Sequence, residues 1–108
     1  MPLRRLKLLN TRECLWIYIL HILKDEPSHA YTLRKEIEKR FGFKPGTMTA
    51  YKVLYLLGKS GLVRKEEYGR KKIYHITEKG EKMLSEAIDF YKNLVKHLNK
   101  NSINKKSI

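Results

Sequence analysis

The chain has 108 residues, with 24 lysines and arginines against 11 aspartates and glutamates, which gives a formal net charge of +13. This length supports one domain with a modest core and excludes two separate cores. The charge favours a polyanionic partner, although a membrane surface or a generally basic proteome would produce the same total. Residues 41–76 carry eight basic and two acidic side chains and are the least neutralised part of the chain.

Cysteine usage and hydropathy indicate a cytoplasmic protein. Cys14 is the only cysteine, which excludes an internal disulfide and favours a reducing compartment. The longest apolar run, Cys14 to Leu23, is too short to span a bilayer, so we expect no membrane association. No small-residue cleavage site follows it, so we interpret residues 1–10 as an N-terminal basic extension and not as a signal peptide.

The first predicted helix runs from about Thr11 to Lys24, with Thr11 as its cap. Its centre is apolar nearly all the way round. A helix of this kind must be covered on more than one side, which one small domain rarely achieves. The helix is therefore a first indication of a dimer. The residues that we assign to the dimer interface are Leu15, Trp16 and Ile19.

The next two predicted helices are joined by a turn. The second helix spans about His29 to Arg40, is capped by Ser28 and ends at Gly42. The turn at residues 43–46 leads to the third helix, which runs from Thr47 to Lys59 and is capped by a threonine at its start. Two short helices joined in this way fit a helix-turn-helix.

The third helix divides into a buried stripe and an exposed side. The stripe recurs at helical spacing and consists of Ala50, Val53, Leu54 and Leu57. The opposite side and its flanks carry Met48, Thr49, Tyr51, Lys52, Tyr55, Leu56 and Lys59. A helix of this width fits the major groove of DNA, with its first threonines at phosphates or base edges. The alternatives are a core role for the tyrosines and a solvated face for the lysines.

Two predicted strands, residues 62–67 and 72–77, flank a loop and form a hairpin. The loop and the start of the second strand carry Arg70, Lys71 and Lys72. Such a turn could serve only solubility, but neighbouring cations repel one another unless an anion neutralises them. Because each contact with a phosphate also releases counterions, we expect this hairpin to contribute affinity for DNA.

The fourth predicted helix spans Glu78 to about Leu98 and is capped by Thr77. Its apolar residues are spaced four, three, four and three, which is a heptad seam. They are Leu84, Ile88, Tyr91, Val95 and Leu98. The most economical partner for this seam is the same helix of a second copy. Residues 99–108 are rich in Asn, Lys and Ser and predict a disordered basic tail.

Three segments of the sequence carry a family resemblance: Ile22-Leu23 through Pro27-Ser28-His29-Ala30-Tyr31, Thr49 to Val63, and Arg70 to Gly80. Their motifs and order resemble the PadR family of winged-helix transcriptional regulators, in the short form with a single C-terminal helix. The resemblance implies a mainly α fold with a small β-hairpin: a winged helix-turn-helix at residues 11–77 and a dimerisation helix at 78–98. It also implies a homodimer in which the last helix packs on the partner's first helix.

The resemblance implies that Thr49, Tyr51 and the wing residues Arg70 to Lys72 contact DNA. With the exposed residues named above, the candidate DNA-binding set is Ser28, His29, Tyr31, Thr47, Thr49, Tyr51, Lys52, Tyr55, Lys59, Arg70, Lys71 and Lys72. Three positions depart from the family pattern: Met48, Lys52 and Leu56 stand where glycine, proline and arginine are usual. Some family members are released by phenolic or drug-like molecules held between the subunits. Trp16 is a candidate for lining such a pocket for a small hydrophobic effector, although core packing is its commoner role.

The expected function is a sequence-specific DNA-binding regulator, a repressor that binds a palindromic operator on double-stranded DNA as a homodimer. The four histidines have no close cysteine or acidic partners and no catalytic spacing is present, so we expect no metal, no cofactor and no enzyme. The exposed side of the third helix has no Arg, Asn or Gln, which leaves open an architectural DNA-binding protein of low specificity. A protein-interaction module that uses the apolar first and fourth helices is a third alternative.

Overall fold

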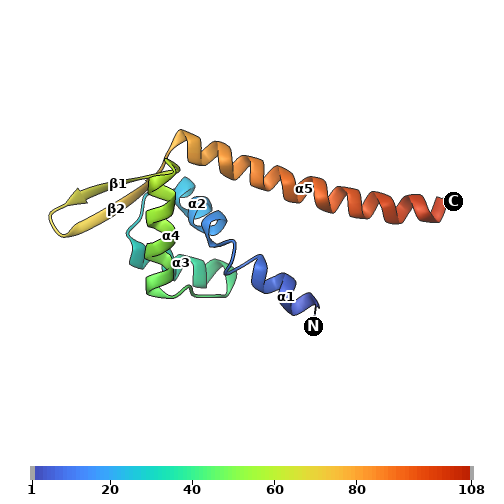
Figure 1. The fold of residues 1–108 in the computed structure, drawn as a ribbon, viewed down its shortest axis with the longest axis horizontal. Helices are drawn as coiled ribbons and strands as arrows, with labels where there is room; N and C mark the ends of the chain where they lie inside the picture. The colour runs from blue at the N-terminus through green and yellow to red at the C-terminus, as the bar shows by residue number, and fades with distance from the viewer. Residues whose placement is uncertain (1, 108) are drawn as a thin grey trace.

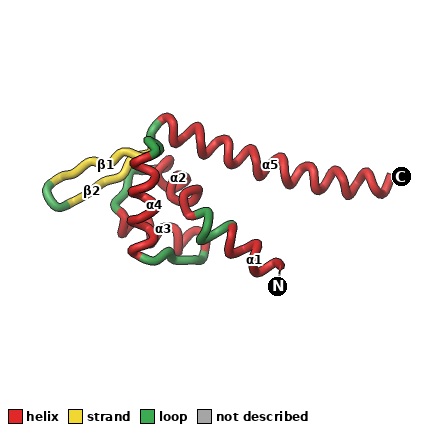
Figure 2. Tube along the Cα trace, in the orientation of Figure 1, coloured by secondary structure: helices red, strands yellow, loops and turns green. Residues whose placement is uncertain are grey.

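The computed structural model describes the backbone of residues 2–107 and the side chains of residues 2–99. Within this part of the chain there are five helices and a two-stranded antiparallel sheet (Figure 1). They are α1 (Pro2–Leu9), α2 (Leu15–Asp25), α3 (Ala30–Phe41), α4 (Thr47–Lys59), β1 (Val63–Tyr68), β2 (Lys71–Ile76) and α5 (Glu78–Ser107). Helices dominate and the strands form one hairpin (Figure 2), which confirms the predicted class and winged helix-turn-helix architecture.

Helix α2 lies at the centre of the core, because it packs against α3, α4, α5 and β2. Five of its eleven residues are buried, and Leu20 is fully inaccessible. The neighbours on its several sides belong to the same chain. The apolar residues around this helix are therefore largely covered within one subunit. This corrects the interpretation that the helix needs a second copy to cover it.

The helix-turn-helix is held by backbone geometry and by one arginine. Gly42 ends α3 in a left-handed conformation, with φ of 79°, and its N–H donates to the carbonyl oxygen of Glu38. Arg34 Nε donates to the carbonyl oxygen of Pro45 at 2.9 Å and fixes the turn to α3. The N-caps are His29 for α3 and Gly46 for α4, neither with a side-chain cap bond, so the predicted hydroxyl caps at these two helix starts are wrong.

Strands β1 and β2 form the wing and pair from Val63 with Ile76 to Tyr68 with Lys71. The predicted strand bounds were off by one residue, and the loop is tighter than expected. Val63 and Tyr74 are buried at the root of the wing. Ser28 extends the pairing: its N–H donates to the Tyr74 carbonyl at 3.1 Å and its carbonyl accepts from the Tyr74 N–H at 2.9 Å. The wing is thereby tied to the residues that precede α3.

The N-terminal extension contains a helix that the sequence pattern did not predict. Helix α1 has no buried residue, and three of its leucines are more than 45 % exposed. Thr11 Oγ1 donates to the carbonyl oxygen of Lys7 at 2.8 Å, so Thr11 closes the end of α1. Helix α2 begins later, at Leu15, with Cys14 at its N-cap position, so the predicted cap at Thr11 is wrong.

Helix α5 projects away from the rest of the molecule (Figure 1). Its N-terminal cap is as predicted, since Thr77 Oγ1 accepts from the Gly80 N–H at 3.0 Å. The helix continues to Ser107, past the predicted end at Leu98, because neither glycine nor proline follows Gly80 to stop it. Of the tail that was expected to be disordered, residues 99–107 are thus helical and Ile108 lies outside the described residues. Within residues 2–107, no helix combines the length and the apolar character needed to cross a membrane.

Candidate nucleic-acid interface

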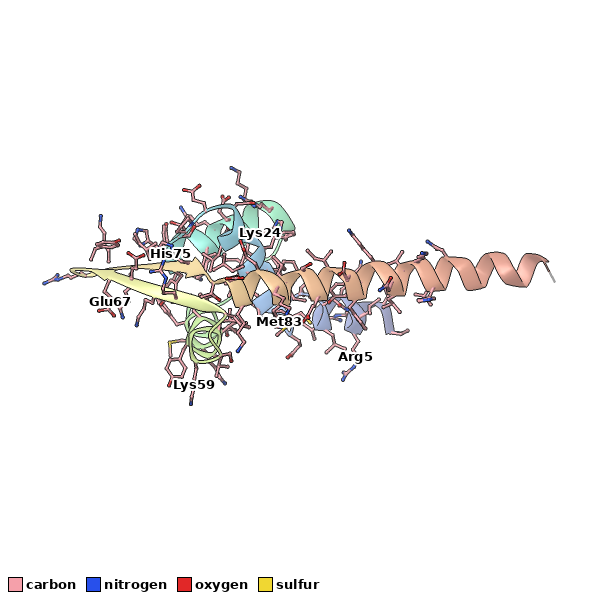
Figure 3. All side chains as sticks on the ribbon, turned by 90° about the horizontal axis from the view of Figure 1, so that it is seen from above. Arg5, Lys24, Lys59, Glu67, His75 and Met83 are labelled. Atoms are coloured by element: carbon pink, nitrogen blue, oxygen red, sulfur yellow. The ribbon has the colours of Figure 1, made fainter. Side chains whose placement is uncertain are left out.

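Helix α4 turns one side to the core and the other to solvent, as its sequence pattern predicted. Ala50, Leu54 and Leu57 are buried. On the other side, Tyr55 is 67 % exposed and Tyr51 48 % exposed, which argues against a role for either as a core aromatic. The other candidates on this helix, Thr47, Thr49, Lys52 and Lys59, are also exposed. Figure 3 shows the Lys59 side chain pointing away from the body of the molecule.

A hollow of about 480 Å³ lies between the start of α3, the first half of α4 and the wing. Its lining consists of His29, Ala30, Tyr31, Tyr51, Arg70, Lys71, Lys72 and Tyr74. Because α3 has no side-chain cap, the N–H groups of its first turn remain available, and the positive end of its dipole adds to the wing cations. Three segments distant in sequence therefore form one concave surface that favours an anion.

His29 and Ser28 hold this surface together. His29 Nδ1 lies 3.0 Å from the carbonyl oxygen of Lys72, and because a carbonyl only accepts, Nδ1 donates. The backbone of Ser28 forms the bridge to Tyr74. Its hydroxyl donates to the carbonyl oxygen of Glu26 at 3.2 Å. Both residues lie at the predicted place, and their contacts position the wing against α3.

A second groove, of about 410 Å³, runs between α4 and the wing. Leu54 and Val63 line it together with Tyr51, Tyr55, Lys59, Tyr74 and Lys65. Lys65 was absent from the candidate residues. The alternation of β1 was the signal that could have found it, because Lys65 pairs with Tyr74 and shares the face of Val63.

The face of the hairpin that points away from this groove carries Arg64, Glu66 and His75. The charges on this face neutralise one another around Glu66. Its carboxylate accepts from Tyr68 Oη and lies 2.6 Å from Arg64 Nη1 and 2.9 Å from His75 Nε2. The Tyr68 and Arg64 hydrogen bonds hold the pKa of Glu66 below its usual value. On the face towards α4, Lys65 pairs with Glu67 at 3.3 Å. Within the described residues, Arg70, Lys71 and Lys72 have no such ion pair, so the tip keeps its positive charge.

The predicted dimer residues separate into two groups. Leu15, Ile19 and Leu84 are at most 2 % exposed within the single chain, so their assignment to an intersubunit seam is corrected. Ile88, Val95 and Leu98 are exposed, and Tyr91 is half-buried, with its hydroxyl donating to Asn10 Oδ1 at 2.8 Å. The apolar face also includes Leu94, which widens the predicted seam and is 43 % exposed, and Phe90, which was not predicted and is 64 % exposed. These two residues each directly precede a residue of the predicted seam, since Phe90 comes before Tyr91 and Leu94 before Val95.

Trp16 is partly buried and stands beside a groove of about 350 Å³ between α2 and α5. The same groove is lined by Ile17, Met83, Ala87, Phe90 and Tyr91. Among the described side chains, no group of three His, Cys, Asp or Glu residues could hold a metal ion.

Comparison with known proteins identifies the family. Residues 19–86 match the model of the transcriptional regulator PadR-like family. A PadR-like transcription factor from Bacteroides fragilis has a similar structure, with a TM-score of 0.75 and 25 % identity over 88 % of this chain and 96 % of that chain. A transcriptional regulator from Clostridium thermocellum gives a TM-score of 0.73 and 25 % identity, over 82 % of this chain and 90 % of the other.

A third solved structure is also similar. F93 from STIV, a winged-helix DNA-binding protein, has 28 % identity and a TM-score of 0.68, over 79 % of this chain and 94 % of its own. A comparison with curated proteins gives no match. The family match covers more than half of the chain, and its motifs lie on the helix-turn-helix and wing described above. The chain belongs to the PadR-like family of winged-helix transcriptional regulators, which are DNA-binding proteins.

Proposed function

We propose that this protein is a cytoplasmic repressor that binds a palindromic operator as a homodimer. The observation that carries the proposal is the hollow in which α3, α4 and the wing converge, with Tyr31, Tyr51 and the cations Arg70 to Lys72 on one surface. In this proposal residues 11–77 bind DNA and residues 78–98 join the two copies.

The roles on DNA follow from chemistry and exposure. The wing cations, Tyr31 and the first-turn N–H groups of α3 bind backbone phosphates, and Thr47 and Thr49 do so at the start of α4. Lys52 and Tyr55, on the exposed side of α4, face base edges in the major groove. His29 keeps the wing at the distance from α3 that lets both elements reach one duplex.

The exposed apolar face of α5 supports the homodimer. Phe90, Val95 and Leu98 are each more than 55 % exposed, and a stretch of helix with such residues has no cover within its own chain. Pairing this face with a second copy brings two α4 helices to successive major grooves, about 34 Å apart.

Selection of bound fragments from genomic DNA, followed by footprinting, tests the proposal. We expect a two-fold symmetric footprint with half-sites about one helical turn apart. An asymmetric footprint on every selected site, or a monomer in sedimentation at the binding concentrations, would contradict it. A reporter placed behind a selected operator tests the sign of regulation, because a repressor lowers transcription when it is expressed.

A second candidate is an architectural protein of low sequence specificity. It is favoured by the exposed side of α4, which offers lysine, tyrosine and threonine but no Arg, Asn or Gln for bidentate base contacts. Competition between selected operator and random DNA over a salt series separates the two. A specificity ratio of about 10³ or more supports the regulator, and a ratio near one supports the architectural protein.

The groove beside Trp16 supports a small hydrophobic effector as part of the proposed regulation. Trp16 is the only tryptophan, and it lines both this groove and a neighbouring hollow of about 360 Å³ beside Leu56 and Leu57, so its fluorescence reports on these two sites. We expect apolar aromatic compounds to change the Trp16 emission and to lower affinity for the operator at the same concentrations. An emission change without any change in affinity would contradict an effector role.

A further inference from the structure

The end of α4 and the start of α5 are joined by hydrogen bonds that centre on one threonine. Thr77 Oγ1 donates to the carbonyl oxygen of Gly61 at 2.6 Å and accepts from the N–H of Gly80 at 3.0 Å. The N–H of Thr77 donates to the carbonyl oxygen of Leu62 at 3.1 Å. Lys79 Nζ adds a bond to the carbonyl oxygen of Ser60 at 3.0 Å. We call these residues, 60–62 and 77–80, the α4–α5 junction.

Gly80 makes this junction close-packed. A Cβ at this position would lie 2.1 Å from the carbonyl oxygen of Leu62 and 2.8 Å from Cγ1 of Ile76. Both distances are far below van der Waals contact, so any other residue would push the first turn of α5 away from the end of α4. Gly61, on the other side of the junction, has a φ of +78°, a backbone conformation that residues other than glycine rarely adopt.

Small changes at this junction are magnified along α5. The helix has 30 residues, so at 1.5 Å per residue it is about 45 Å long, and a tilt of about 10° at its start moves its far end by about 8 Å. Helix α4 is in turn fixed to the core by its buried stripe. The junction therefore sets the start of α5 relative to α4, while the packing of α5 on α2, with Leu84 buried, holds the turns that follow.

We infer that the α4–α5 junction determines the distance between the two α4 helices of the dimer, and hence the spacing of operator half-sites that the protein prefers. The inference rests on the proposed dimer through α5. Thr77 and Gly80 are positioning residues: they do not line the hollow proposed to bind phosphate, and they act by fixing the angle at which each subunit is held. A regulator with a fixed angle accepts one half-site spacing, whereas a loosened junction accepts several.

The test measures the distance between the α4 helices directly. A single spin label is attached at Lys52→Cys in a Cys14→Ala background, and the distance between the two labels of the dimer is measured by pulsed electron resonance without DNA. Thr77→Val removes the hydroxyl and both of its bonds while it keeps the shape of the side chain. Thr77→Ser is the matched control because it keeps the hydroxyl, and Gly80→Ala displaces the start of α5 by sterics alone.

The background protein and Thr77→Ser should give one narrow distance distribution, and Thr77→Val and Gly80→Ala a shifted or broadened one. In parallel, each protein without the label mutations selects from a DNA library in which two half-sites are separated by variable spacers. We expect the preference for the best spacer to fall about tenfold in Thr77→Val, with binding to an isolated half-site unchanged.

The outcomes separate the two levels of the proposal. If the background protein is monomeric, the proposed dimer fails and this inference fails with it. If it is a dimer, and Thr77→Val and Gly80→Ala both fold, an unchanged distance and spacer preference overturns the inference alone. Circular dichroism verifies the fold of each variant. Should Gly80→Ala fail to fold, the comparison of Thr77→Val with Thr77→Ser is decisive.

Discussion

The Nδ1 atom of His29 donates a hydrogen bond to the backbone carbonyl of Lys72 at 3.0 Å, across 43 positions of sequence. This bond and the backbone bridge between Ser28 and Tyr74 join the start of the helix-turn-helix to the wing. The two parts of the proposed DNA surface are thus held in a fixed relation before DNA arrives.

The first prediction concerns that bond. His29→Ala removes a donor and should weaken operator binding about fivefold, as expected for the loss of one hydrogen bond worth about 1 kcal/mol. Amide hydrogen exchange of residues 71–74 should become faster, because the wing is released from α3. His97→Ala, an exposed histidine of α5, is the control. Unchanged exchange in His29→Ala would show that the bond does not hold the wing.

The second prediction separates phosphate binding from general charge. Lys71→Ala should weaken binding to operator and random DNA equally and reduce the salt slope by about one unit, since one phosphate contact is lost. Lys24→Ala removes the same charge in the last turn of α2 (Figure 3), outside the proposed DNA-binding set, and it should leave the slope unchanged. The prediction fails if titrations of the two variants over a salt series give the same slope.

The third prediction concerns base reading by α4. Lys52→Ala and Tyr55→Ala should alter which base is preferred within each half-site, in addition to any loss of affinity. Selection from a library randomised within the half-site measures this preference. Equal losses on every sequence would mean that these side chains contact only the DNA backbone and would strengthen the architectural alternative.

The sequence pattern predicted some parts of this arrangement better than others. Periodicity separated the faces of α4, because buried Leu54 and exposed Tyr55 follow from helical geometry alone. It failed at Leu84, which a heptad pattern assigns to a partner, because a pattern does not reveal which chain covers an apolar residue. The hydroxyl cap at Ser28 failed because the residue lies one position before the N-cap and its backbone bridges to Tyr74, and at α4 the N-cap position is Gly46, before Thr47. The bond from His29 to Lys72 depends on tertiary placement and has no local signal.

The fourth prediction concerns the stability of the wing at low pH, which depends on the Glu66 carboxylate. The bonds from Tyr68 and Arg64 lower the pKa of Glu66, so the ionised form is stabilised in the folded wing. A lowered pKa gives stability that is present above the unfolded value, near about 4.3, and is lost as pH falls through the folded value. The protection of the wing amides from hydrogen exchange, relative to their intrinsic rates at each pH, should therefore fall between about pH 5 and pH 3, more than in Glu66→Gln. An equal loss of protection in both proteins would exclude Glu66 as the cause.

The fifth prediction follows from the burial of α5. Leu84 is 2 % exposed and Val95 56 % exposed, so the same substitution has different consequences at the two positions. Val95→Asp and Leu98→Asp should leave each subunit folded, since neither residue is covered by its own chain, but should dissociate the proposed dimer. Leu84→Asp should unfold the subunit, because it places a charge in the core. Sedimentation and circular dichroism distinguish these outcomes. A folded Val95→Asp protein that remained dimeric would place the interface elsewhere, and α2 with its groove at Trp16 would then be the surface to test.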